Sequence, residues 1–163
     1  MTDTLAPRSL FRSALGRFAT GVTIVSCVDD GGGFVGLTAN SFNSLSLDPP
    51  LVLWSLRENS PSLPVFVGAT RFAINVLSEA QVDLSRRFAA RIEQKFDSGG
   101  WTLGEHGTPV LAGCVAVFEC ETVSHQPAGD HRLFVGRVLA FTETTLPPLV
   151  FQGGHYHLLG EIL

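Results

Sequence analysis

The chain has 163 residues, a length typical of one domain, and we expect a single domain over residues 1–163. Its 11 Lys and Arg against 15 Asp and Glu give a net charge of −4, so the cationic surface that dominates nucleic-acid affinity is missing. No apolar run approaches the about 18 residues that span a bilayer, and residues 1–12 carry no apolar signal core. We therefore expect a cytoplasmic protein without nucleic-acid or membrane partners.

The chain is poor in charge and has an odd number of cysteines. Only 16% of its residues are charged, whereas about 25% is usual in globular proteins. So little charge leaves apolar surface on a monomer, and we therefore expect a homodimer. Cys27, Cys114 and Cys120 each lie in an apolar run without C-x-x-C spacing. This pattern indicates buried thiols rather than a disulfide framework or a zinc site.

The first half of the chain predicts two helices, from apolar side chains at helical spacing, and four strands, from β-branched runs between turn signals. The helices are expected at residues 7–19 and 79–90, and the strands at 22–28, 34–38, 51–56 and 71–77. The glycine-rich segment 29–33 should join the first two strands as a hairpin turn.

The second half is also rich in strands. Residues 91–109 predict a long surface loop, and two long strands are expected at 114–124 and 132–142, joined by residues 125–131. The tail, 149–159, holds two short apolar pieces around Gly153-Gly154. Seven or so strands with two or three helices favour a mainly β fold, and a closed barrel would remove exposed strand edges.

Two motifs invite a functional interpretation that their setting weakens. Residues 31–36, Gly-Gly-Gly-Phe-Val-Gly, match the letters of a dinucleotide fingerprint, but a strand rather than a helix is expected to follow. Asp130 and His131 could belong to a nucleophilic triad, yet adjacent residues of an extended chain point to opposite faces. Ordinary turn chemistry at Gly129 and Asp130 is the alternative for this pair.

His155 and His157 form an H-x-H pair, which places both imidazoles on one face of a strand. This spacing suits a metal ion, and Glu161, His125 and His131 are the candidates to complete such a site. No carboxylate cluster with ligand spacing accompanies the pair. We therefore expect no metal site, and the alternative is a tail with one exposed and one packed histidine.

The segment 36–42, Gly-Leu-Thr-Ala-Asn-Ser-Phe, gathers short polar side chains at an expected strand end. A flavin ring needs such a surface, because its polar edge binds amides and small polar groups while its faces contact small or apolar groups. A polar loop without a ligand is the alternative. Ser60 before Pro61 predicts a helix cap, and this helix start, with Ser55 and Arg57 before it, would suit a phosphate.

Together, these segments resemble the flavin reductase family with the FMN-binding split-barrel fold, the small reductase components of two-component flavin monooxygenases. The matching stretches come in family order and cover nearly the whole chain. They are FATGVTIV at 18–25, GLTANSF at 36–42, SLDPPLV at 46–52, FAINVL at 72–77, KF at 95–96, PAGDH at 127–131, FVGRV at 134–138 and the tail around 154–156.

The resemblance implies a split β-barrel of Greek-key type with a few flanking helices. It also implies which residues meet the flavin, FMN or FAD: Thr38, Ala39, Asn40 and Ser41 at the ring, and Ser55, Arg57, Ser60, Arg87, Lys95 and Phe96 around the ribityl chain and phosphate. His131, His155 and Tyr156 would lie near the nicotinamide, with His131 as the catalytic, orienting group.

The implied reaction is hydride transfer from NADH or NADPH to the flavin, which needs no general base. Reduced flavin would then leave for a separate oxygenase, since the chain offers no second domain for hydroxylation. Two alternatives remain open. One is a flavin-binding storage or sensor protein of the same fold without NADH turnover, and the other is a small metal-dependent barrel enzyme that uses His155 and His157.

Overall fold

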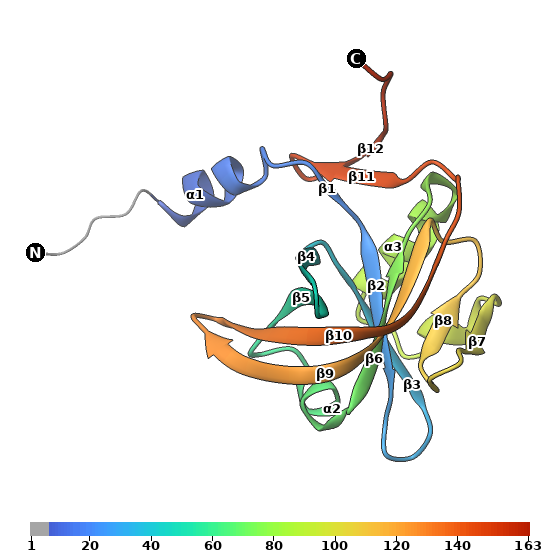
Figure 1. Ribbon diagram of the computed structural model, residues 1–163. Coiled ribbons are helices and arrows are strands. Elements are labelled where there is room, and N and C mark those ends of the chain that lie inside the picture. The colour runs from blue at the N-terminus through green and yellow to red at the C-terminus, as the bar shows by residue number, and fades with distance from the viewer. Residues whose placement is uncertain (1–6) are drawn as a thin grey trace, which may run out of the picture.

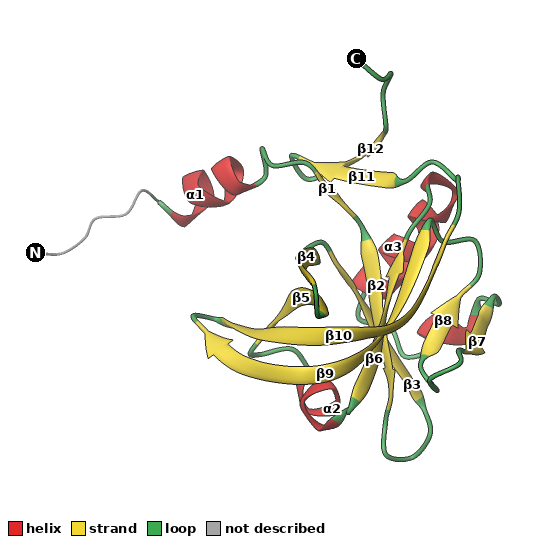
Figure 2. Ribbon diagram, viewed as in Figure 1, coloured by secondary structure: helices red, strands yellow, loops and turns green. Residues whose placement is uncertain are grey.

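The computed structural model describes residues 7–163, and strands predominate in it (Figures 1 and 2). The first six positions, part of the segment 1–12 in which no signal core was expected, lie outside the described residues. The helices are α1 Arg8–Leu15, α2 Leu63–Gly68 and α3 Val82–Ala89, with short 3-10 turns at Glu79–Gln81 and Lys95–Asp97. The strands are β1 Thr20–Gly21, β2 Thr23–Val28, β3 Phe34–Ala39, β4 Asn43–Leu47, β5 Pro50–Arg57, β6 Arg71–Val76, β7 Trp101–Leu103, β8 Pro109–Leu111, β9 Ala116–Ala128, β10 His131–Glu143, β11 Leu149–Gln152 and β12 His155–Leu158.

Seven antiparallel strands form the main sheet, in the order β3-β2-β6-β9-β10-β5-β4. Its two edge strands, β3 and β4, follow each other in the chain and are separated by only residues 40–42. So short a link forces the sheet to curl until its edges approach each other. This is the geometry of a split barrel, and the predicted fold class is confirmed. Smaller sheets, β1-β11-β12 and β7-β8, lie beside the barrel (Figure 1).

The barrel core is built around aromatic side chains. Trp54 is fully buried and stacks on Phe134 at 4.7 Å between ring centroids, with Phe66 edge-on at 5.0 Å. Gly136 on β10 leaves room for the ring of Phe72, which a Cβ at that position would overlap. A second core lies between the sheet and α3, around Ile24, Leu77, Phe88, Leu111 and Leu149.

The glycine-rich motif is a hairpin turn, as predicted. Asp29 Oδ1 accepts hydrogen bonds from the amides of Gly31 (2.9 Å) and Gly33 (2.8 Å). Gly32 has a φ of 83°, which L side chains rarely adopt. Strand β3 follows the turn, so the helix N-terminus of a dinucleotide fingerprint is missing at this place.

Several predicted boundaries were wrong. The helix expected at 7–19 ends at Leu15, because Thr20 and Gly21 pair with β11. The loop expected at 125–131 is mostly strand: β9 and β10 continue to a two-residue turn, Gly129-Asp130, in which Gly129 has a φ of 62°. The long loop 91–109 contains β7, and α2 and β4 had no periodic signal that predicted them.

The helix α1 projects from the barrel (Figure 1). Residues 7–19 are all exposed except the half-buried Gly16, and none of them belongs to either core. The helix is held at its C-terminal end, where the amide of Gly153 donates to the carbonyl of Gly16 at 2.7 Å. Within residues 7–163 no helix is both long and apolar enough to cross a membrane.

Candidate functional site

The predicted flavin segment lies where the barrel is split. Thr38 and Ala39 end the edge strand β3, and Asn40 and Ser41 form the link to the opposite edge strand. Ala39 faces the core at 9% exposure, whereas Asn40 is exposed. At the end of β3, successive side chains therefore alternate: apolar ones pack in the core, and small or polar ones face the opening.

Ser41 closes this opening through its side chain. Its hydroxyl donates to the carbonyl of Ser55 at 3.0 Å and accepts from the amide of Ser55 at 3.0 Å. The pairing of β4 with β5 begins at Asn43, which lies opposite Leu53. Two residues earlier the backbones are not paired, and the hydroxyl of Ser41 makes the hydrogen bonds to β5 instead. The structure thus brings together two predicted site residues, Ser41 and Ser55. The hydroxyl proton of Ser41 is already donated to the Ser55 carbonyl.

The backbone amides of Asn40, Ser41 and Phe42 donate no hydrogen bond to any other described residue. Backbone N–H groups in folded proteins almost always find a partner, which for exposed groups is water or a ligand. Three consecutive free donors at the barrel opening match a ligand whose edge is rich in acceptors. The oxygens and ring nitrogens of a flavin are such an edge, so the residues present fit the implied group.

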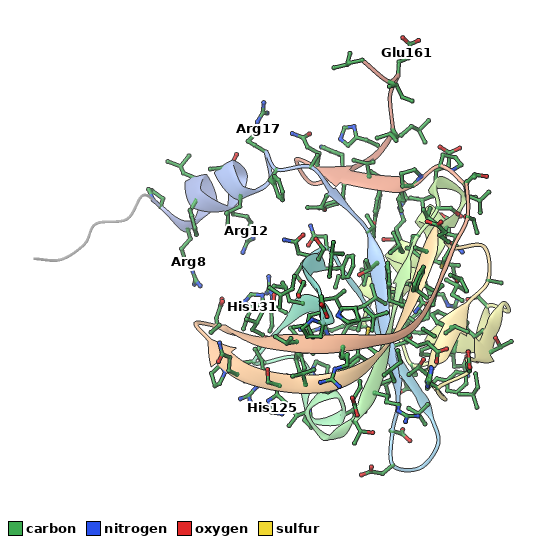
Figure 3. All side chains as sticks on the ribbon, viewed as in Figure 1. Arg8, Arg12, Arg17, His125, His131 and Glu161 are labelled. Carbon is green, nitrogen blue, oxygen red and sulfur yellow. The ribbon has the colours of Figure 1, made fainter. Side chains whose placement is uncertain are left out.

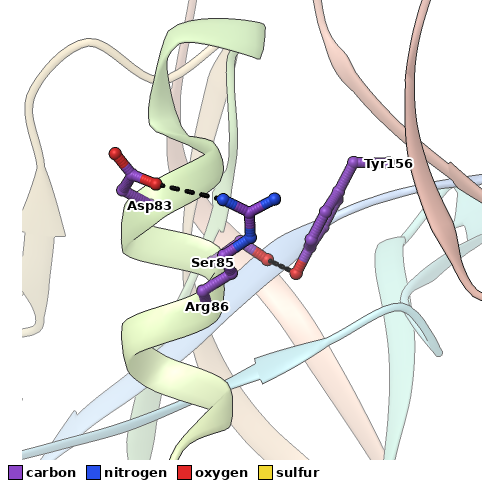
Figure 4. Close-up of polar contacts among 4 residues, drawn as sticks. All are labelled: Asp83, Ser85, Arg86 and Tyr156. Atoms are coloured by element: carbon purple, nitrogen blue, oxygen red, sulfur yellow. Dashed lines mark hydrogen bonds and ion pairs between the residues drawn. The ribbon is translucent and has the colours of Figure 1, made fainter.

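A polar chain joins this segment to α3 and to the C-terminal hairpin (Figure 4). Thr38 Oγ1 donates to the carbonyl of Ser85 at 2.6 Å, and the Ser85 hydroxyl lies 2.8 Å from the hydroxyl of Tyr156. The guanidinium of Arg86 lies 5.5 Å from the centre of the Tyr156 ring and pairs with Asp83 at 3.3 Å. Tyr156 is therefore anchored next to the flavin segment rather than free in the tail.

Arg87 and Lys95 lie together at the C-terminal end of α3. Lys95 Nζ donates to the carbonyl of Phe88 at 3.0 Å, and Arg87 donates to the carbonyls of Lys95 (2.9 Å) and Gln94. Partial burial lowers the pKa of Lys95. Phe96 packs edge-on against Phe88 at 4.9 Å. Arg87, Lys95 and Phe96, three predicted flavin contacts, thus hold the loop after α3 against the helix. Some N–H donors of Arg87 and Lys95 are already bonded to backbone carbonyls.

Arg57 and His131 are opposite each other in the register of β5 and β10. The His131 Nδ1 atom lies 2.7 Å from Asp130 Oδ1, and this contact lowers the pKa of Asp130. The expectation that the two side chains point apart was wrong, because Asp130 lies in the turn and not on the strand. The turn is fastened to β5 by the amide of Glu58, which donates to the Asp130 carbonyl at 3.0 Å.

Ser60 does not cap a helix, and that prediction was wrong. The helix α2 begins at Leu63 after Ser62, and Pro64 rather than Pro61 stands in its first turn. The Ser60 hydroxyl instead accepts from the amide of Ser62 at 3.3 Å within the preceding turn. The phosphate argument from a capped helix start therefore does not apply to Ser60.

His155 and His157 are both exposed on β12, so the expectation of one exposed and one packed histidine was wrong. Their spacing of two residues places both on the same face of the strand. His157 Nε2 lies 3.1 Å from the carbonyl of Gln152. Across residues 7–163, no three His, Cys, Asp or Glu side chains gather in a way that could hold a metal ion.

Within one chain the predicted nicotinamide contacts fall into two places. Tyr156 belongs to the polar chain at α3. His131 stands instead at the tip of the β9–β10 hairpin (Figure 3). Two surface hollows, of about 440 and 380 Å³, lie elsewhere: one between α2 and β9 and one beside the Asp29 turn. Neither is lined by a predicted flavin or nicotinamide contact.

Sequence analysis did not identify Ser85 or Asp130 as functional. Ser85 lies in a polar helical stretch where nothing distinguishes it from other serines, and only the approach of β3 and β12 gives it a role. Asp130 was predicted to be a turn residue, and the structure places it in the β9–β10 turn. Its contact with the His131 ring was not predicted.

Comparison with known proteins extends this geometry. Residues 15–160 match the flavin reductase like domain. The chain is 47% identical over 146 residues to FMN reductase (NADH) SmoA of Agrobacterium fabrum, covering 90% of this chain and 83% of that protein. It is 41% identical over 145 residues to the reductase component of the flavin-dependent trigonelline monooxygenase of Acinetobacter baylyi, covering 89% of this chain and 47% of that protein.

Among solved structures, NADH:FAD oxidoreductase SgcE6 of Streptomyces globisporus C-1027, in complex with NAD and FAD fragments, superposes with a TM-score of 0.89 at 35% identity. The superposition covers 94% of this chain and 93% of that one. The chain spans about half the length of two of the curated relatives that it matches.

Proposed function

Because this chain belongs to the family of the flavin reductase like domain, we propose that it is an NAD(P)H:flavin oxidoreductase, acting through one flavin-binding domain. Two similar proteins, FMN reductase (NADH) SmoA and NADH:FAD oxidoreductase SgcE6, are named for reducing FMN or FAD with NADH. We therefore propose FMN or FAD as the flavin and NADH as the favoured electron donor.

One observation carries the proposal: the three free amides of residues 40–42 at the opening of the barrel. They follow the core residue Ala39, and the Ser41 hydroxyl in their middle fastens this segment to the backbone of Ser55. A preorganised row of donors beside small side chains fits the acceptor edge of an isoalloxazine ring. The remaining predicted contacts, Ser55, Arg57, Ser60, Arg87, Lys95 and Phe96, are proposed to surround its ribityl chain and phosphate.

A bound flavin would supply the hydride acceptor, its N5 atom, for the hydride on C4 of the nicotinamide. The protein's part is to hold the two rings in contact and to exclude competing orientations. We propose that His131, kept in place by Asp130, orients the nicotinamide, and that Tyr156 and His155 belong to a second group of contacts beside α3. No residue has to act as a general base, since a hydride moves without a proton leaving a side chain.

The test is NADH oxidation by the purified protein, followed by absorbance, with and without added FMN or FAD. Turnover that rises and saturates with free flavin is the expected result. A protein that binds flavin but oxidises neither NADH nor NADPH would overturn the reductase and leave the flavin-binding protein without turnover.

We further propose that reduced flavin passes to a separate oxygenase, as the name of the trigonelline monooxygenase reductase component implies for that relative. The exposure of Asn40 at the barrel opening supports this proposal, because a ligand held at an exposed segment can leave. Release is tested by adding an unrelated flavin-dependent oxygenase behind a dialysis membrane. Product formation there requires freely diffusing reduced flavin.

The exposed surface supports a homodimer. The chain exposes 10322 Å², whereas a compact folded monomer of 17.5 kDa exposes about 7,900 Å². Large apolar side chains of α1 and the tail account for part of the surplus, among them Leu10, Phe11, Leu15 and Leu158, each at least 57% exposed. We propose that a second copy covers them. Sedimentation equilibrium should give twice the chain mass, and a single-chain mass at micromolar concentration would contradict the dimer.

A further inference from the structure

The helix α1 and the turn after it form a cationic segment in an acidic protein. Arg8, Arg12 and Arg17 lie within ten residues that contain no Asp or Glu, whereas the whole chain has a net charge of −4. Between residues 7 and 163, neither Arg8 nor Arg12 forms an ion pair with a carboxylate.

Arg8 and Arg12 are four residues apart and therefore lie on the same face of α1. Like charges at this spacing destabilise an isolated helix. Nothing in the described chain offsets this repulsion, since α1 has no acidic residue in its first turn and buries no side chain. An anion bound between the two guanidinium groups would offset it.

The position of α1 relates these arginines to the proposed active site. Its C-terminal end is tied through Gly16 to Gly153, in the turn that leads into His155 and Tyr156. Arg8 and Arg12 point toward the end of the β9–β10 hairpin that carries His131, whereas Arg17 points away (Figure 3). The charge of Arg8 reaches Asp130, because it contributes to lowering the pKa of that carboxyl. The helix is thus tied to the turn before one group of proposed nicotinamide contacts, and its arginines lie on the side of the hairpin that carries the other.

We propose that Arg8 and Arg12 bind the diphosphate of a dinucleotide whose reactive ring lies at the barrel opening. The proposal rests on the proposed reductase function. Guanidinium groups bind phosphate oxygens in a bidentate manner, and two of them on one helix face match a diphosphate better than a single phosphate. Both NADH and FAD carry a diphosphate, whereas reduced nicotinamide mononucleotide and FMN do not.

The experiment compares these four ligands in the full chain. The variant Arg8→Gln/Arg12→Gln removes both charges but keeps the long, helix-compatible stems, and Arg17→Gln removes one charge from the other side of the same segment. Steady-state KM values are measured for NADH against reduced nicotinamide mononucleotide, and for FAD against FMN. Circular dichroism and sedimentation confirm that each variant keeps its fold and its oligomeric state.

The expected result is a KM for NADH, for FAD or for both that rises about 5- to 30-fold in the double variant, as for lost charge-assisted hydrogen bonds. The matching mononucleotide should change less than twofold, and Arg17→Gln should resemble the wild type. The dinucleotide that responds identifies which diphosphate is bound. Equal changes for mono- and dinucleotides, or no change for either dinucleotide, would overturn the proposal.

A calorimetric titration with ADP against adenosine separates this inference from the proposed function. Weaker ADP binding in the double variant, with adenosine unaffected, would support the site even in a protein that oxidises no NADH. Unaltered ADP binding would count against the site even if the wild type is an active reductase.

Discussion

The Ser41 hydroxyl makes two hydrogen bonds of 3.0 Å to the backbone of Ser55, one as donor and one as acceptor. This single side chain fastens the link between the edge strands β3 and β4 to the strand β5. The same link holds the three free amides proposed to bind the flavin. The stability of the barrel opening and the geometry of the site therefore depend on the same residue.

Replacing Ser41 by alanine should remove both bonds and leave the amide and carbonyl of Ser55 unpaired. We expect the free energy of unfolding to fall by about 1–3 kcal/mol, measured by urea denaturation, and the Kd for FMN, measured by fluorescence quenching, to rise. Ser44→Ala is the matched control, because Ser44 is exposed on the neighbouring strand and its hydroxyl makes no hydrogen bond within the described chain. Equal stability of the two variants would contradict the role of Ser41.

Gly136 should tolerate no side chain. A Cβ there would overlap the buried ring of Phe72 and approach Cys120 Cβ to 3.1 Å. Gly136→Ala should therefore destabilise the protein by about 1–3 kcal/mol through overpacking. Gly68→Ala, at the end of α2, meets nothing within 4 Å and should stay within about 0.5 kcal/mol of the wild type. Urea denaturation of both variants tests the difference, and the idea fails if both are equally stable.

The three cysteines should be unreactive in the folded protein. Burial raises the pKa of Cys27, Cys114 and Cys120 to about 12 each, so at pH 8 almost no thiolate is present to react. Native protein should release no chromophore from a disulfide reagent, and protein in guanidinium chloride should titrate three thiols. Fast reaction of any thiol in the native state would show that it is accessible.

These thiols also predict a direction of pH dependence. The unfolded chain loses its thiol protons near pH 9.0, the ordinary value, whereas the folded chain holds them until about 12. The stability that this difference contributes is complete below pH 9.0 and is lost as the pH rises toward 12. In a variant with all three cysteines replaced by alanine, the free energy of unfolding should decline less between pH 9.0 and about 12. An unchanged decline would show that groups other than the thiols cause it.

His131→Ala should raise the KM for NADH more than the KM for flavin, because His131 stands at the proposed nicotinamide side of the site. Asp130→Asn should produce a smaller effect of the same kind, since it weakens the contact of 2.7 Å that holds the ring. His157→Ala is the control, as His157 contacts only the carbonyl of Gln152 among the described residues. Equal changes in both KM values would remove His131 from the nicotinamide site.

The contact between Asp130 and His131 can be observed directly. It lowers the pKa of Asp130, chiefly through the hydrogen bond from His131. The pair should therefore persist at pH values above the ordinary carboxyl pKa of 3.8 and be lost only as the pH falls below it. The carboxyl carbon shift of Asp130 in a nuclear magnetic resonance titration should have its midpoint below 3.8 in the wild type. In His131→Ala, the midpoint should move up toward 3.8.

Sequence by itself was sufficient for the mainly β class and the hairpin at the Asp29 turn, because these depend on side-chain alternation and on local turn chemistry. The family was identified from the resemblance of short motifs such as GLTANSF at 36–42. The boundaries of the long hairpin were not predictable to the same degree. Residues 125–128, His-Gln-Pro-Ala, carry no strand signal, and they extend β9 only because β10 pairs with them. Strand β4 is likewise a strand because β5 lies beside it.

The candidate site divides in the same way. Short polar side chains at 38–41 were visible in the sequence, since a cluster after an apolar run is a local pattern. Which of them bind a ligand and which bind the protein depends on contacts between residues far apart in the chain, such as Thr38 with Ser85 and Ser85 with Tyr156, 71 residues away. Such contacts arise when α3 packs against β3 and the C-terminal hairpin packs against α3. Residue spacing along the chain carries no record of that packing, and therefore only the tertiary structure decided it.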